Sequence, residues 1–122
     1  MHALVYTGTE KIEYREEKDP IAKPGETLIK VQASGICGSD MHAYHGKDER
    51  RIPPLILGHE FSGISLDGKF KNKQVVINPL ISCEKCAYCQ NKREHLCPKR
   101  TMIGMSTPVS YTHLTLPTNA CV

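Results

Sequence analysis

The stretch CEKCAYCQNKREHLCP spans residues 83–98 and places four cysteines in the pattern C-x-x-C-x-x-C, seven residues, then C. Four thiolates this close in sequence can surround one tetrahedral zinc ion, and a site filled by four protein ligands is closed and structural. We therefore predict a structural zinc lobe over residues 83–98, with the ligands Cys83, Cys86, Cys89 and Cys97.

Two other uses of these cysteines stay open at the level of sequence. Four cysteines allow three disulfide pairings, but the start of the chain has neither the basic residues nor the apolar length of a secretory signal. Bacterial ferredoxins carry C-x-x-C-x-x-C-x-x-x-C-P, and Pro98 follows Cys97 here, although the last spacing is seven residues. We expect a cytoplasmic protein, in which glutathione keeps thiols reduced, so zinc is favoured.

Composition excludes several classes of function. The chain has 122 residues, of which 39% are hydrophobic and 24% charged, with a net charge of +3, which suits one modest globular domain. It has no basic stripe with interleaved aromatic residues, so nucleic acid is not expected as a partner. No apolar run approaches the roughly 20 residues of a membrane helix, so no membrane association is expected. The charge run Lys47 to Arg51 is predicted to be a solvated loop.

Short alternating segments predict a strand-rich fold. Ile29, Val31 and Ala33 alternate with polar residues and should share one face of a strand over residues 27–33. Ser39 is predicted to cap a short helix that stops near Gly46. Further strands are predicted over residues 3–6, 12–15, 61–66 and 74–77, the last two joined by a turn at residues 67–68. The fold class is therefore mainly β, a small barrel-like domain with short helices and the zinc lobe attached.

A second, more open metal site is suggested by Cys37, His59 and Glu60. Thiolate, imidazole and carboxylate are all zinc ligands, and a catalytic zinc ion keeps three protein ligands and one free position. Bound zinc polarises a carbonyl or alcohol oxygen as a Lewis acid. On spacing alone a buried structural Cys37 and a surface His59–Glu60 pair is the alternative, because Cys37 and His59 are 22 positions apart and no short motif links them.

The last 22 residues differ in composition from the rest. Residues 101–122 contain no Asp, Glu, Lys or Arg, and they hold five of the eight threonines. The stretch VSYTHLTLPT, residues 109–118, resembles the translation of a common sequencing-library adapter. We therefore expect the natural domain to occupy residues 1–107 and residues 108–122 to be a non-native tail, in which His113 and Cys121 have no function.

Three motifs in this order resemble a known family. They are GICGSDMH at residues 35–42, GHEFSG at residues 58–63, and the cysteine lobe. Together they resemble the catalytic domain of the zinc-dependent medium-chain alcohol and polyol dehydrogenases, over about residues 1 to 107. The resemblance implies a GroES-like β-barrel followed by a nicotinamide-binding Rossmann domain. That second domain is absent from the sequence, which has no G-x-G-x-x-G fingerprint, and a zinc ligand that some members supply from later in the chain is also missing.

The resemblance also implies roles for individual residues. Cys37 and His59 would be ligands of a catalytic zinc ion, and Glu60 either a third ligand or a close neighbour. Asp40 would orient the imidazole of His59, as carboxylates commonly do for metal-bound histidines. Ser39 would hydrogen-bond the substrate hydroxyl and start a proton relay that ends at His42.

The sequence thus predicts the front part of a larger oxidoreductase. The parent would transfer hydride between a secondary alcohol or polyol and a nicotinamide cofactor, NAD or NADP. It would hold two zinc ions, one catalytic and one structural, and form a homo-oligomer. A sugar phosphate or amino alcohol is the alternative substrate, and a non-enzymatic zinc module is the alternative function. The 122-residue chain is expected to be inactive alone, because the hydride acceptor has no site in it.

Overall fold

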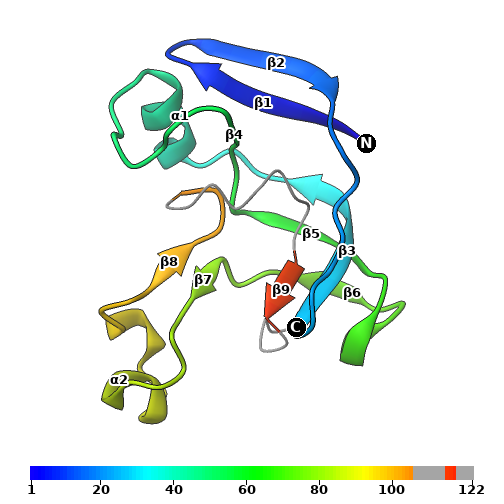
Figure 1. Cartoon of the computed structure of the whole chain (residues 1–122), viewed down its shortest axis with the longest axis vertical. Helices are drawn as coiled ribbons and strands as arrows, with labels where there is room; N and C mark the ends of the chain where they lie inside the picture. The colour runs from blue at the N-terminus through cyan, green and yellow to red at the C-terminus, as the bar shows by residue number, and fades with distance from the viewer. Residues whose placement is uncertain (106–114, 118–122) are drawn as a thin grey trace.

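The computed structural model describes residues 1–105 and the short strand at residues 115–117 (Figure 1). Strands dominate and helices are short, so the predicted fold class is confirmed. The predicted non-native tail, residues 108–122, lies outside the described residues except for that strand. The elements are β1 His2–Gly8, β2 Lys11–Glu16, β3 Glu26–Ser34, α1 Gly38–Tyr44, β4 Leu55–Ile56, β5 Phe61–Ser65, η1 Gly68–Phe70, β6 Gln74–Val76, β7 Leu80–Ile81, α2 Ala87–Gln90, η2 Glu94–Leu96, β8 Thr101–Met102 and β9 Thr115–Pro117.

The described part of the chain forms three small antiparallel sheets. Their strand orders are β2-β1-β4, β6-β5-β3-β9 and β7-β8. In Figure 1 the β1–β2 hairpin lies at one end of the molecule, and the lobe that contains α2 lies at the other, beyond β7 and β8. The two-stranded β7–β8 sheet is therefore the stem that joins the lobe to the rest of the domain.

None of the helices in the described part of the chain combines the length and the apolar character needed to cross a bilayer.

The core lies where β3, β5 and β6 meet. Its buried members are Ile29, Phe61, Val75 and Ile77, and Ile103 packs against them. Alternation along β3 is correctly predicted as far as Val31, which is partly buried. The pairing with β5 then shifts register between Val31 and Ala33, which leaves Ala33 exposed rather than on the face of Ile29. The bulge ends the alternation because two residues of β3 span one step of β5.

A close approach of backbone makes Gly63 a sensitive position. Gly63 pairs with Val31, and a Cβ added to it would lie 2.2 Å from the carbonyl oxygen of Lys30. We expect Gly63→Ala to lower the free energy of unfolding by about 1–3 kcal/mol, the usual cost of overpacking. Gly8→Ala is the matched control, because an added Cβ there meets nothing within 4 Å. Urea unfolding of both variants measures this, and equal effects would contradict the close approach.

Candidate metal centres

Four cysteine sulfur atoms converge in the lobe. Cys83 follows β7, Cys86 caps α2, Cys89 lies within α2 and Cys97 follows η2. The four sulfur atoms all lie within 4.8 Å of one another. The sulfur of Cys89 is 3.5 Å from that of Cys86 and 4.0 Å from that of Cys83. The spacing pattern in the sequence therefore brings together the four residues it predicts.

These separations fit one tetrahedral ion. Zinc–sulfur bonds of about 2.3 Å imply sulfur–sulfur edges of about 3.8 Å in a tetrahedron, close to the distances found. They are far longer than the roughly 2.05 Å of a disulfide, and all five cysteines of the described residues are free thiols. The disulfide alternative is therefore wrong for the lobe. In a four-iron cluster each thiolate would bind a different iron atom, which would hold the four sulfur atoms farther apart than they lie here. An iron–sulfur cluster is therefore disfavoured.

The lobe prepares one thiol for metal binding. Backbone N–H groups of Lys85 and Cys86 donate to the sulfur of Cys83, and with the neighbouring Cys97 they lower the Cys83 pKa to about 6. The turn that directs these N–H groups toward the Cys83 sulfur includes Glu84, whose φ is 57°. A thiol with such a pKa is largely thiolate at neutral pH, which is the form that binds metal.

The second set of candidate ligand atoms comes from two segments that connect strands and helices. Cys37 lies between β3 and α1, and His59 and Glu60 lie between β4 and β5. One ligand atom from each lies within 4.8 Å of the others. A backbone hydrogen bond of 2.7 Å from the Gly35 N–H to the Glu60 carbonyl holds the two connections together. His59 is buried, Cys37 is half-buried and Glu60 is exposed.

The N-cap of α1 is not the residue that the sequence predicts. The helix begins at Gly38 with Cys37 as its N-cap, so the prediction of Ser39 as the cap is wrong. The Asp40 side chain takes up the free amide instead, because its Oδ2 accepts from the Cys37 N–H at 3.0 Å. The return bond from the third helical residue to the cap backbone is half of a capping box. The Ser39 hydroxyl is therefore not used to cap the helix.

Asp40 also lies beside the candidate histidine ligand. Its Oδ1 is 3.5 Å from the Nδ1 of His59, and both side chains are only 7% exposed. Among the described residues, this buried Nδ1 has no hydrogen-bond partner within bonding distance. An imidazole with Nδ1 toward a carboxylate has Nε2 left for a metal ion. The donor set of thiolate, imidazole and carboxylate, with a carboxylate behind the imidazole, suits zinc.

The two predicted relay residues lie on α1. Ser39 is half-buried in the first turn, and His42 is exposed in the last turn. The Ser39 Oγ accepts a hydrogen bond of 3.0 Å from an Arg51 Nη2.

Arg51 is a buried residue of this region that the sequence analysis missed. Its side chain is 0% exposed, and its Nη1 lies 2.6 Å from the Asp40 Oδ1. Its Nε lies 3.4 Å from Asp48 Oδ2. The prediction that the charge run at residues 47–51 is entirely solvated is therefore wrong for Arg51 and for the Asp48 side chain, which is 8% exposed. No local pattern signals this, because Asp40 is 11 residues earlier and is reached only when the loop after α1 returns.

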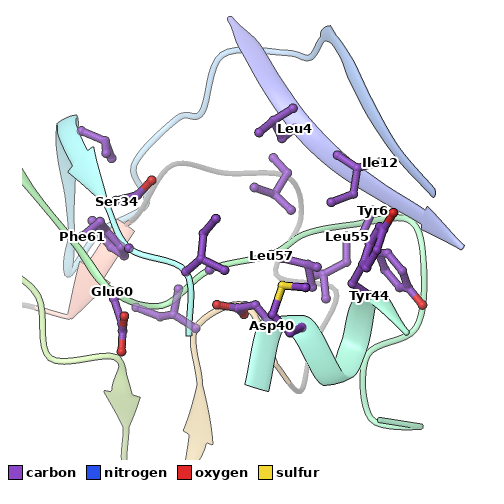
Figure 2. A pocket seen from close by; sticks show the side chains of 18 of the residues that line it. Leu4, Tyr6, Ile12, Ser34, Asp40, Tyr44, Leu55, Leu57, Glu60 and Phe61 are labelled. Atoms are coloured by element: carbon purple, nitrogen blue, oxygen red, sulfur yellow. The ribbon is translucent and has the colours of Figure 1, made fainter. Parts of the chain in front are cut away.

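A mainly apolar cavity of about 670 Å³ adjoins this centre. Figure 2 shows Asp40 and Glu60 along one side of it, with Leu4, Ile12 and Leu55 around the rest. Ile103 and Gly104, which follow the stem strand β8, also line it. A Cβ added to Gly104 would lie 2.3 Å from the carbonyl oxygen of Gly58, so the chain leaving the lobe passes directly against the residue before His59.

A mainly β domain with a closed thiolate centre and an open mixed centre is typical of zinc-type dehydrogenases. The sequence profile of the alcohol dehydrogenase GroES-like domain matches residues 23–122. The chain belongs to this family.

Several known proteins with similar chains are named as dehydrogenases. The chain is 32% identical over 112 residues to L-galactonate-5-dehydrogenase of Escherichia coli K12, covering 86% of this chain and 33% of that protein. It is 34% identical over 122 residues to erythritol/L-threitol dehydrogenase of Mycolicibacterium smegmatis, covering 85% and 34%. Among solved structures, the cobalt- and zinc-bound thermostable alcohol dehydrogenase of Pyrobaculum aerophilum aligns with a TM-score of 0.79 at 26% identity, covering 88% and 36%. The chain thus spans about a third of the length of the curated relatives it matches.

Proposed function

We propose that this chain is the zinc-bearing catalytic part of a dehydrogenase that transfers hydride between a secondary alcohol or polyol and a nicotinamide cofactor. The observation that carries the proposal is the convergence of Cys37, His59 and Glu60 beside a cavity, in a domain that also holds a closed set of four thiols. The names of the relatives, which act on a sugar acid and on small polyols, support the substrate class.

Each side chain of the open centre has a proposed task. The Cys37 thiolate and the His59 imidazole would hold a zinc ion, with Glu60 as third ligand or close neighbour. A zinc ion bound there would polarise an alcohol or carbonyl oxygen as a Lewis acid. Asp40 would fix the ring of His59, since its carboxylate is buried against Nδ1. Ser39 would accept the proton of the substrate hydroxyl and pass it toward His42, while Cys83, Cys86, Cys89 and Cys97 would hold the structural zinc ion.

The wider features of the protein are proposed on the same basis. The natural domain would occupy residues 1–107, and the nicotinamide, NAD or NADP, would bind to a further domain of a cytoplasmic, homo-oligomeric parent enzyme. A sugar phosphate or amino alcohol is the alternative substrate class. Because the G-x-G-x-x-G fingerprint of a nicotinamide-binding domain does not occur in the 122 residues, this chain should show no alcohol-dependent nicotinamide reduction, while the parent enzyme should. Absorbance at 340 nm, followed for both proteins with a panel of polyols, tests this.

Metal content tests the proposal most directly. We expect the purified chain to hold two zinc ions, one for each candidate centre. Cys37→Ser or His59→Ala should remove the ion of the open centre and leave that of the lobe. The measurement is zinc analysis by mass spectrometry after dialysis against a weak chelator. His45→Ala is the matched control, since His45 lies at the end of α1 and pairs with the exposed Glu10 instead.

The rival function makes a different prediction for the same proteins. A non-enzymatic zinc module would hold one ion, lost only when a lobe cysteine is replaced. A single ion in the wild-type chain, unaffected by Cys37→Ser and His59→Ala, would therefore overturn the dehydrogenase proposal in favour of the module.

A further inference from the structure

The guanidinium of Arg51 connects two residues that act at the open centre. Its Nη1 is 2.6 Å from the Asp40 Oδ1, and its Nη2 donates to the Ser39 Oγ at 3.0 Å. The Arg51 side chain is fully buried. A buried charge is tolerated only when it is paired and hydrogen-bonded. The planar guanidinium offers donors in a fixed fork, so it sets the relative positions of the carboxylate and the hydroxyl.

Arg51 is linked to the candidate ligands Cys37 and His59 through the side chain of Asp40. The Asp40 Oδ2 accepts from the backbone N–H of Cys37 at 3.0 Å, and Oδ1 faces the Nδ1 of His59 at 3.5 Å. Arg51 therefore holds the same oxygen that faces the imidazole. Any rotation of the carboxylate that broke the contact with Arg51 would also move this oxygen relative to His59.

The contact with Ser39 has a separate consequence. A serine hydroxyl has one O–H donor and two acceptor positions. Arg51 occupies one acceptor position of Ser39. The other acceptor position can take the proton of an alcohol, and the O–H can donate onward. This is the bonding pattern that a residue needs if it is to pass a proton from one partner to another.

We propose that Arg51 is a positioning residue of the open metal centre, which locks Asp40 against Cys37 and His59 and orients the Ser39 hydroxyl. The inference rests on the proposed function, because it assumes that these residues hold a metal ion. Within the described part of the chain, the polar contacts of the Arg51 side chain are with Asp40, Ser39 and Asp48. It acts through the side chains of Asp40 and Ser39.

Cobalt binding by the full chain tests this without any enzymatic reaction. Arg51→Lys keeps the positive charge but loses the fork that spans the two acceptors. We expect it to weaken cobalt binding at the open centre about 10- to 100-fold, the usual cost of disturbing the groups behind a metal ligand. The absorption bands of cobalt in the lobe should not change, which reports that the domain is folded. Arg15→Lys is the matched control, because that arginine on β2 pairs with Glu13 and Glu17 instead.

A double variant separates positioning from general stability. If Arg51 acts through Asp40, adding Arg51→Lys to Asp40→Asn should weaken the open centre no further than Asp40→Asn alone. Should Arg51→Lys fail to fold by circular dichroism, Asp48→Asn takes its place. That change replaces the charged carboxylate 3.4 Å from the Arg51 Nε with a neutral amide and should weaken cobalt binding several-fold.

The outcomes distinguish this inference from the proposed function. A wild-type chain that binds one cobalt ion, in the lobe alone, would overturn the proposed function and this inference together. A wild-type chain with two ions, whose open centre binds cobalt equally well after Arg51→Lys or after Asp48→Asn, would overturn the role of Arg51 alone. Additive losses in the double variant would also overturn it, because they would indicate that Arg51 does not act through Asp40.

Discussion

Cys97→Ser is expected to abolish metal binding in the lobe and to unfold it. Cys97 is 0% exposed, and it is one of four sulfur atoms that lie within 4.8 Å of one another. A neutral serine hydroxyl cannot replace a thiolate ligand. Structural zinc contributes about 10–16 kcal/mol to the folding of small zinc-finger peptides. Without it, α2 with its four residues and η2 with its three are too short to persist.

Tryptic digestion measures this effect at a defined place. Lys92 and Arg93 lie in the turn between α2 and η2, so cleavage after them reports the opening of the lobe. We expect the metal-loaded wild-type chain to resist cleavage there and Cys97→Ser to be cut at least about 100-fold faster, which corresponds to a loss of nearly 3 kcal/mol of local stability. Cys37→Ser is the control, and its lobe should remain protected. Equal cleavage rates in all three proteins would show that the lobe does not depend on a metal ion.

Ser39→Ala is expected to lower kcat of the full-length parent enzyme by about 10²–10⁴-fold, the usual contribution of one general acid–base group. The hydroxyl accepts from Arg51, and its remaining positions suit a proton relay. Steady-state kinetics with a polyol substrate measure the loss, and zinc analysis must show that the open centre keeps its ion.

Ser62→Ala is the control for this change. Ser62 lies on β5 and, like Ser39, is half-buried, but it is neither one of the three candidate ligands nor one of the residues that line the adjoining cavity. Its kcat should stay within about twofold of wild type, because surface and half-buried substitutions away from special features are usually mild. A fall of less than tenfold in Ser39→Ala, with zinc retained, would remove Ser39 from the relay.

The sequence could predict the longer strands but not the shortest ones. Alternation over residues 27–31 correctly places Ile29 in the core. By contrast, β4, β7 and β8 have two residues each, which is too short for a period-two pattern to emerge. Their pairing is decided by the partner strand and by the chain that leads into them. The stem of the lobe is therefore visible only in the structure.

The two metal centres differ in how far the sequence predicts them. Local spacing is enough for the lobe, because its four ligands lie within 15 residues. Spacing alone leaves the role of Cys37 and His59 undecided, and only the family resemblance implies that they share a metal ion. The structure places one ligand atom of each within 4.8 Å of the other. Arg51 was missed because its burial depends on the path of a loop. A charge run predicts solvation only when none of its members meets a buried partner.

The contact between Gly104 and Gly58 would couple the two proposed metal centres to each other. The chain leaves the lobe along β8, places Ile103 on the core and then lies against the residue before His59. Loss of an ion from the lobe would loosen this returning segment and with it the support behind His59. A coupling free energy between two binding sites is reciprocal, so an ion at the open centre would strengthen metal binding in the lobe by the same factor. The domain is therefore expected to fill its two centres with positive cooperativity.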